Sequence, residues 1–123
     1  MPLTREQERA KLAHQQVSAV QRRTDQEQRK YRTITRKAQA LIRNAGLCQA
    51  LHFIASKKEF ESLKDDLQGH LAEHTGMRGD ILEAVRSMSL SEYLAATREV
   101  LQCLTWQCRM VDALLQEGDD TND

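Results

Sequence analysis

The sequence predicts an all-α protein, a single-domain helical bundle of about five to six helices with the longest helix at the C-terminal end. The 123 residues include only five glycines and one proline, too little turn chemistry for a β-sandwich or barrel. Hydrophobic residues make up 40% and charged residues 29%, a balance typical of a globular chain. Apolar residues recur at helical spacing along most of the chain. This length has room for one domain, residues 1–123.

The first half of the chain predicts three helices. Thr4 is followed three residues later by Gln7, the pattern of a capping box at a helix start. The apolar spacing lapses around Thr24, which predicts a turn or a kink. The next helix ends near Gly46, a favoured residue at helix C-termini. Its apolar stripe is made of Tyr31, Ile34, Ala38, Leu41 and Ile42. A short third helix is expected over residues 47–54.

A fourth helix is expected to open at a capping box formed by Ser56 and Glu59. Its inward-facing residues would be Phe60, Leu63, Leu67, Leu71 and His74. Gly76 and Gly79 then break the chain, and a short apolar element follows over residues 81–88.

The last and longest helix is expected to start at a third capping box, Ser89 with Glu92. Besides its main apolar stripe it carries a second apolar face, made of Cys103, Trp106, Met110 and Ala113. A helix that is apolar most of the way round is either central in a bundle or shared with a neighbouring chain. Both interpretations stay open, and the second makes Trp106 and Met110 interface residues. Residues 117–123 are expected to form a disordered acidic tail.

The charge is unevenly distributed, although Lys+Arg and Asp+Glu both number 18. The first 43 residues hold 11 basic and 4 acidic side chains, and the remaining 80 hold 7 basic and 14 acidic ones. On the second helix Arg29, Arg32, Arg36 and Arg43 fall within a sector of about 60°, opposite the apolar stripe, with Lys37 beside it. We expect this sector to be solvent-accessible and to bind nucleic-acid phosphates, because no acidic residue of the segment neutralises it. A plain solvated face and an acidic protein partner are the alternatives.

No catalytic residues, cofactor or metal site are predicted. His70 and His74 stand four residues apart, a spacing that can hold a metal, but Leu71, Ala72 and Glu73 do not complete a zinc-peptidase motif. We therefore expect the pair to be packed or surface histidines. The carboxylates lie on solvated helix faces, so no pair is held for acid–base work.

The three cysteines are widely spaced and are expected to be small buried hydrophobes in a reducing compartment. The N-terminus has no secretory signal, and the longest uncharged run is too short to span a bilayer. We expect a cytoplasmic protein that does not engage a membrane.

Three segments resemble one family, the small helical subunit of the Cmr complex, which is the type III-B CRISPR RNA-guided effector. Residues 37–57 are similar to its central signature, residues 92–106 to its C-terminal signature, and residues 4–7 to its start. The match runs in order through nearly the whole chain, in packing motifs. Gln39 departs from the pattern, where a proline is expected.

The resemblance implies an all-helical subunit without a nuclease of its own, which stacks head to tail in the inner filament of an antiviral complex. Its partners would be the other protein subunits and the backbones of guide RNA and target RNA. The basic residues that it carries over are Lys37, Arg43 and Lys57, whereas Arg29, Arg32 and Arg36 rest on helix geometry alone. Two alternatives remain: the small subunit of the type III-A complex or another helical nucleic-acid binder, and a helical adaptor that docks an acidic protein.

Overall fold

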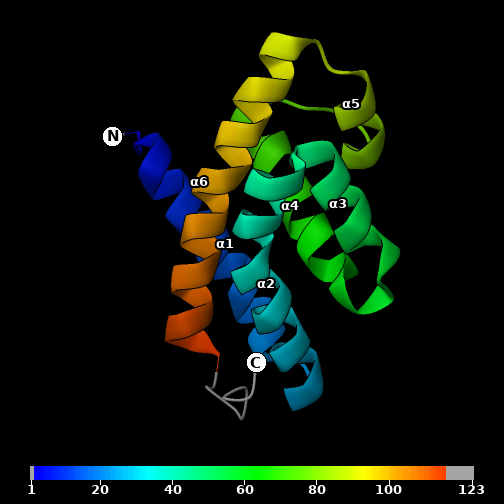
Figure 1. Ribbon diagram of the computed structural model, residues 1–123. Helices are drawn as coiled ribbons and strands as arrows, with labels where there is room; N and C mark the ends of the chain where they lie inside the picture. The colour runs from blue at the N-terminus through cyan, green and yellow to red at the C-terminus, as the bar shows by residue number, and fades with distance from the viewer. Residues whose placement is uncertain (1, 116–123) are drawn as a thin grey trace.

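The computed structural model describes residues 2–115, which form six α-helices and one short 3₁₀ helix (Figure 1). In chain order they are α1 (Arg5–Gln21), α2 (Asp25–Ala45), α3 (Leu47–Ser56), η1 (Lys58–Phe60, 3₁₀), α4 (Glu61–Thr75), α5 (Ile81–Ser87) and α6 (Leu90–Leu114). The predicted all-α class is confirmed, and the longest helix is the C-terminal α6, as expected. The predicted acidic tail, residues 117–123, lies outside the described residues.

Capping boxes fix where three of the helices begin. The hydroxyls of Thr4, Thr24 and Ser89 each accept the backbone N–H three residues on, and the side chain there accepts the cap's own N–H. The box at Thr24 was not predicted. The box expected at Ser56 is wrong, because α3 continues through that residue and its hydroxyl donates to the carbonyl of Phe53 at 2.7 Å.

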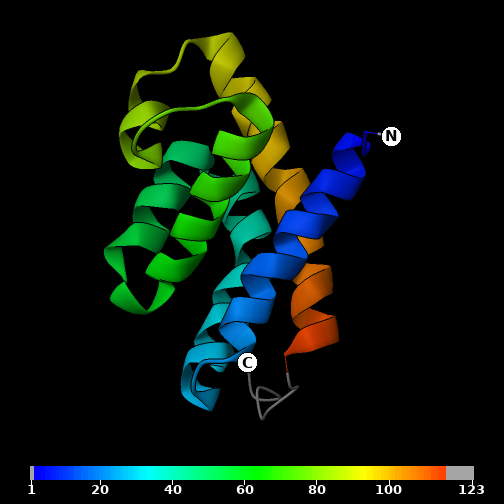
Figure 2. The same ribbon diagram turned by 180° about the vertical axis from the view of Figure 1, so that it is seen from behind.

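The helices pack around α2 and α6, and α4 contacts both of them. The longest helix, α6, lies against α1 and α2, and α1 crosses behind them when the molecule is seen as in Figure 1 (Figure 2). On the other side of α2, α3 and α4 pack against one another, and α5 lies against α3. This arrangement leaves α2 and α6 side by side on one face of the molecule.

One hydrophobic core draws side chains from all six α-helices. Its fully buried leucines include Leu47 and Leu51 of α3, Leu67 and Leu71 of α4, and Leu104 of α6. Truncating one such leucine to alanine costs about 2–5 kcal/mol. The core therefore fixes α2 and α6 relative to one another, and with them the charged residues on their outer surfaces.

Candidate nucleic-acid interface

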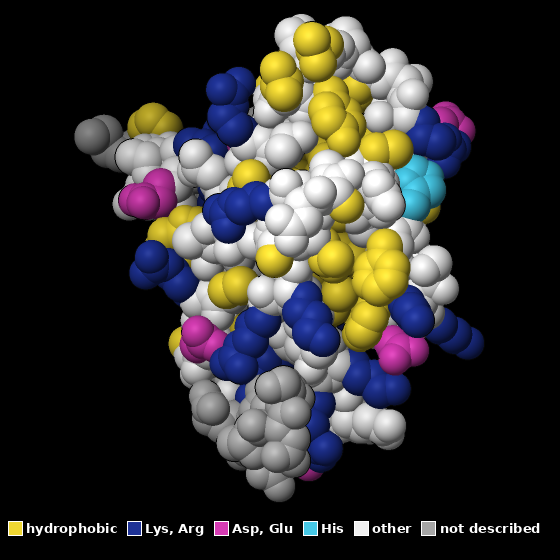
Figure 3. All heavy atoms as spheres, viewed as in Figure 1, with side chains coloured by type: hydrophobic (Ala, Val, Ile, Leu, Met, Phe, Trp, Pro, Cys, Tyr) yellow, Lys and Arg dark blue, Asp and Glu magenta, His cyan; other side chains and the backbone are white. Residues whose placement is uncertain are grey.

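Three of the four predicted arginines are exposed on the outer surface of α2. Arg29, Arg36 and Arg43 recur every seven residues, so they stay within about 40° of one another around the helix. The first and the last are 14 positions apart, or about 21 Å along the helix axis. Lys and Arg side chains gather over the lower half of the face on which α2 and α6 lie (Figure 3).

The expectation that Arg32 lies on this solvent-accessible face is wrong. Its side chain is only 2% exposed. Arg32 lies seven residues before Gln39, and the two residues therefore share nearly the same ridge of α2. Gln39 faces α6, where its amide donates to the carbonyl of Leu101 at 3.0 Å and to the hydroxyl of Thr105 at 2.9 Å. Arg32 therefore lies on the side of α2 that faces α6.

An acidic residue from another helix does reach the basic surface. Arg36 Nη2 donates to Asp112 Oδ1 of α6 at 2.9 Å, and both side chains are largely exposed. The segment from 28 to 58 contains no acidic residue, but this contact comes from outside the segment. Such an exposed ion pair contributes about 0–1 kcal/mol.

Lys37 and Lys57 are exposed but lie away from the arginines. Lys37 is one residue from Arg36 and so is turned about 100° from it around α2. Lys57 follows the end of α3, where its ammonium stands 5.9 Å from the centre of the Phe53 ring. Nearby, Lys30 pairs with Glu59 at 3.7 Å. The six predicted contact residues therefore do not form one continuous stripe.

Two arginines of α6 extend the basic surface. Arg98 and Arg109 are both exposed and lie within about 40° of Thr105 around the helix. Thr105 borders α2 through its contact with Gln39. We call the set Arg29, Arg36, Arg43, Arg98 and Arg109 the basic face. The two α6 arginines were not predicted from the sequence, because only the fold brings α6 beside α2.

The second apolar face of α6 divides into parts with different surroundings. Cys103 is fully buried, which corrects its placement on a separate outward face. Met110 packs against the core, whereas Trp106 is half-buried and is not part of that cluster. The guanidinium of Arg109 lies 5.7 Å from the Trp106 ring centre, and both residues line a surface hollow of about 320 Å³.

A chain of polar side chains crosses the core between α4, α6 and α2. His70 of α4 bonds through Nδ1 to His74 Nε2 at 3.3 Å and through Nε2 to Gln107 Oε1 at 2.8 Å. The Gln107 amide donates to the hydroxyl of Tyr31 at 2.7 Å, which donates to Asp66 Oδ2 at 2.6 Å. Burial lowers the pKa of His70 to about 4 and raises that of Asp66 to about 6. The histidine is therefore neutral at pH 7.

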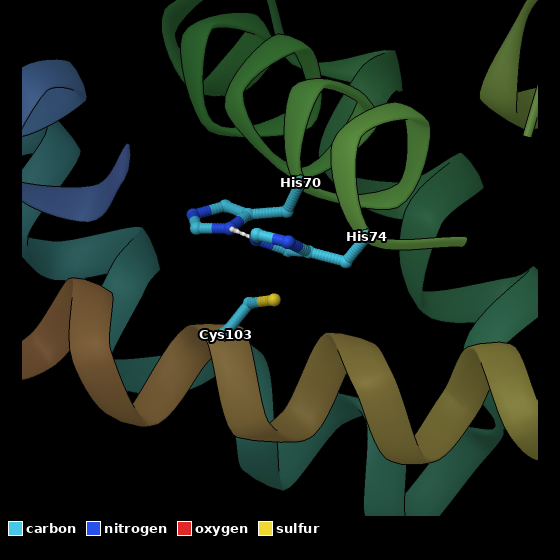
Figure 4. A group of neighbouring side chains, drawn as sticks. All are labelled: His70, His74 and Cys103. Atoms are coloured by element: carbon cyan, nitrogen blue, oxygen red, sulfur yellow. Dashed lines mark hydrogen bonds between the residues drawn. The ribbon is translucent and has the colours of Figure 1, made fainter. Parts of the chain in front are cut away.

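Cys103 of α6 joins this histidine pair (Figure 4). One ligand atom from each of His70, His74 and Cys103 lies within 4.8 Å of the others, and all three residues are buried. Burial, with the neighbouring Glu99 carboxylate, raises the pKa of the Cys103 thiol far above its ordinary value. The sequence could not indicate this cluster, because Cys103 stands 29 residues beyond His74 on another helix.

None of the helices in residues 2–115 combines the length and the apolar character needed to cross a membrane.

Comparisons with known proteins give a consistent result. A family described as CRISPR-associated protein (Cas_Cmr5) matches residues 5–114. The chain is 40% identical, over 91 residues, to the CRISPR system Cmr subunit Cmr5 of Thermus thermophilus, covering 71% of this chain and 76% of that protein. It also superposes on the crystal structure of a CRISPR-associated Cmr5 family protein from Thermus thermophilus. That match has a TM-score of 0.80 and 35% identity, and it covers 93% of this chain and all of the other. The chain therefore belongs to the Cas_Cmr5 family of CRISPR-associated proteins.

Proposed function

We propose that this protein is a non-catalytic, structural subunit of the Cmr (type III-B) RNA-guided effector complex, an antiviral assembly of the cytoplasm, and that its basic face contacts RNA backbone. Family membership and the 40% identity to a protein named as a Cmr subunit support a place in that complex. The partners would be the other protein subunits, further copies stacked head to tail, and the guide RNA and target RNA.

The observation that carries the RNA proposal is the basic face itself. It places five exposed arginines on two neighbouring helices that the core holds rigidly. Guanidinium groups bind phosphate oxygens in a two-pronged geometry, and about 21 Å of helix is long enough to follow several phosphates of one strand. Base pairing between the two RNAs would supply sequence specificity, so the protein needs only backbone contacts.

Arg32 is left out of this proposal because it is buried. Lys37 and Lys57, which lie to the side of the basic face, would contact RNA only where the strand or a second protein curves around α2. The alternative function, an adaptor that docks an acidic protein, is supported by one contact. The Asp112 carboxylate forms an ion pair with Arg36. An acidic protein segment could use the same geometry.

The test compares RNA affinity against salt for the assembled complex carrying Arg36→Gln with Arg43→Gln. Losing two phosphate contacts should lower the salt slope by about 1.4, at about 0.7 per contact for a single strand. Affinity should fall equally for RNAs of different sequence. The matched control is Lys11→Gln with Arg78→Gln, which removes the same charge from exposed residues off the basic face.

Equal slopes in the variant and the unchanged complex would reject the phosphate contacts. If RNA binding were unchanged but the variant failed to enter the complex, the acidic-partner alternative would replace the RNA proposal. Equal losses in the variant and the control would show a general charge effect, which also contradicts a specific basic face.

A further inference from the structure

We propose that His70, His74 and Cys103 form a buried site for a divalent transition-metal ion, best suited to Zn²⁺. The three residues come from two helices that the core packs against one another, α4 and α6. This inference is independent of the RNA proposal, because the cluster lies inside the bundle and not on the basic face.

The spacing of the two histidines fits a shared ion. Zn–N bonds of about 2.0–2.1 Å at the tetrahedral angle place two ligand nitrogens about 3.3–3.4 Å apart. His70 Nδ1 and His74 Nε2 stand 3.3 Å apart. Cys103 Sγ and one ring nitrogen of each histidine all lie within 4.8 Å of one another. An N–S separation of about 3.6 Å is needed in such a site, so a shift of about 1 Å in one side chain completes it.

The surroundings supply the outer contacts that metal-bound histidines use. His70 Nε2 bonds to Gln107 Oε1 at 2.8 Å, which fixes the N–H on that nitrogen and leaves Nδ1 with its lone pair toward the cluster. Gln107 is in turn held by Tyr31, to whose hydroxyl it donates. His70 thus has one nitrogen anchored to a buried amide and the other aimed at His74.

Glu99 and Arg9 set the local charge. Glu99 Oε2 lies 3.3 Å from Cys103 Sγ and accepts from Arg9 Nε at 2.7 Å, so a carboxylate with its guanidinium partner stands beside the thiol. Binding releases the Cys103 thiol proton to solvent and moves the His74 N–H from Nε2 to Nδ1, which leaves a thiolate and two neutral imidazoles on the ion. His74 is 7% exposed, so the cluster lies close to the surface at that histidine.

The experiment uses the full chain after treatment with a chelator, titrated with Co²⁺ as a spectroscopic probe and with Zn²⁺. We expect one ion per chain, tetrahedral Co²⁺ absorption with a thiolate charge-transfer band, and a rise in Tm with Zn²⁺ that follows from binding to the folded state. Cys103→Ser should abolish the charge-transfer band. His74→Gln, at the edge of the cluster, should weaken Zn²⁺ binding by at least about tenfold.

The matched control is Cys48→Ser. Cys48 also lies near a histidine, with Sγ 3.8 Å from His52 Nδ1, but this pair is on α3 and outside the cluster. The control should leave the Co²⁺ spectrum unchanged. Three outcomes overturn the proposal: no saturable binding by the folded chain, a spectrum lost with Cys48→Ser but kept with Cys103→Ser, or full affinity in a folded His74→Gln variant.

Discussion

Arg9 of α1 donates two hydrogen bonds to Glu99 of α6, from Nε to Oε2 at 2.7 Å and from Nη2 to Oε1 at 2.9 Å. The two residues are 90 positions apart in the chain. Glu99 is only 7% exposed, so its charge depends on this partner. The pair ties the N-terminal helix to the C-terminal one, and Arg5 adds a longer contact at 3.5 Å.

The first prediction concerns acid stability. The hydrogen bonds from Arg9 hold the pKa of Glu99 down to about 2. A depressed carboxyl pKa contributes stability that is fully present above the unfolded value of 4.5 and is lost as pH falls toward 2. Glu99→Gln should therefore cost about 1.5–3 kcal/mol near pH 7 in urea unfolding, the range for a hydrogen bond to a charged group.

The same measurement near pH 3 should find the variant and the unchanged protein much closer in stability. Glu73→Gln, an exposed position on α4, serves as the control and should change little at either pH. A constant difference between Glu99→Gln and the unchanged protein at both pH values would contradict the assignment.

A second prediction concerns the corner between α2 and α3. Gly46 has φ of +89°, where a side chain is strained, and an added Cβ would stand 3.3 Å from the hydroxyl of Tyr93. That hydroxyl accepts the backbone N–H of Cys48 at 2.9 Å, so it cannot move without losing the bond. Gly46→Ala should cost more than the strain alone, which is about 1–2 kcal/mol.

Gly76→Ala is the matched comparison for that variant. Gly76 also has a positive φ, +75°, but no atom lies within 4 Å of the added Cβ. Thermal unfolding should show a larger drop in Tm for Gly46→Ala than for Gly76→Ala. Equal drops would mean that the contact with Tyr93 adds nothing to the backbone strain.

A third prediction concerns the buried polar chain. Tyr31→Phe removes the hydroxyl that links Gln107 to Asp66 and leaves both groups short of a partner, at a cost of about 1–3 kcal/mol. The same variant should change the pKa of Asp66. Burial raises the pKa of Asp66 to about 6, while the Tyr31 hydrogen bond works against that rise. The variant should therefore raise the pKa of Asp66 further. A raised carboxyl pKa costs stability as pH rises from about 4 through 6, so the variant's deficit should be larger at pH 7 than at pH 4.

NMR titration of the Asp66 carboxyl carbon, together with urea unfolding at the two pH values, checks this prediction. Thr33→Val removes a half-buried hydroxyl from the same helix, and it serves as the control for the loss of a hydroxyl that is not part of the polar chain. An unchanged Asp66 pKa in Tyr31→Phe would contradict the role given to the hydroxyl.

Local sequence signals predicted the helices well, because caps and breaks depend on neighbouring residues. Thr4, Ser89, Gly46 and Gly76 act as expected. Ser56 failed as a cap because α3 continues through it, and the chain then tightens into the 3₁₀ helix η1.

The surface was predicted less well, because burial depends on which helix covers each ridge. The apolar stripe through Tyr31 placed Arg32 outward, but Arg32 and Thr35 are both buried, so the buried sector of α2 is wider than that stripe. For the same reason the sequence did not predict Cys103 as a neighbour of His70. These contacts join helices that are distant in sequence, and no periodicity within one helix encodes them.

The last prediction concerns Trp106 in assembly. The ring is half-buried, lies outside the core cluster and carries the Arg109 guanidinium at 5.7 Å beside a surface hollow. A large aromatic ring with an arginine at a surface hollow is typical of the anchors that dominate protein interfaces. Trp106→Ala should therefore leave a folded protein that co-purifies poorly with the other Cmr subunits. Met110→Ala is the contrasting variant, because Met110 packs against the core and its truncation should lower Tm more than it weakens assembly. Melting curves and co-purification, measured on both variants, distinguish the two roles. A large loss of Tm in Trp106→Ala with normal assembly would instead make the ring a stabilising element of the fold.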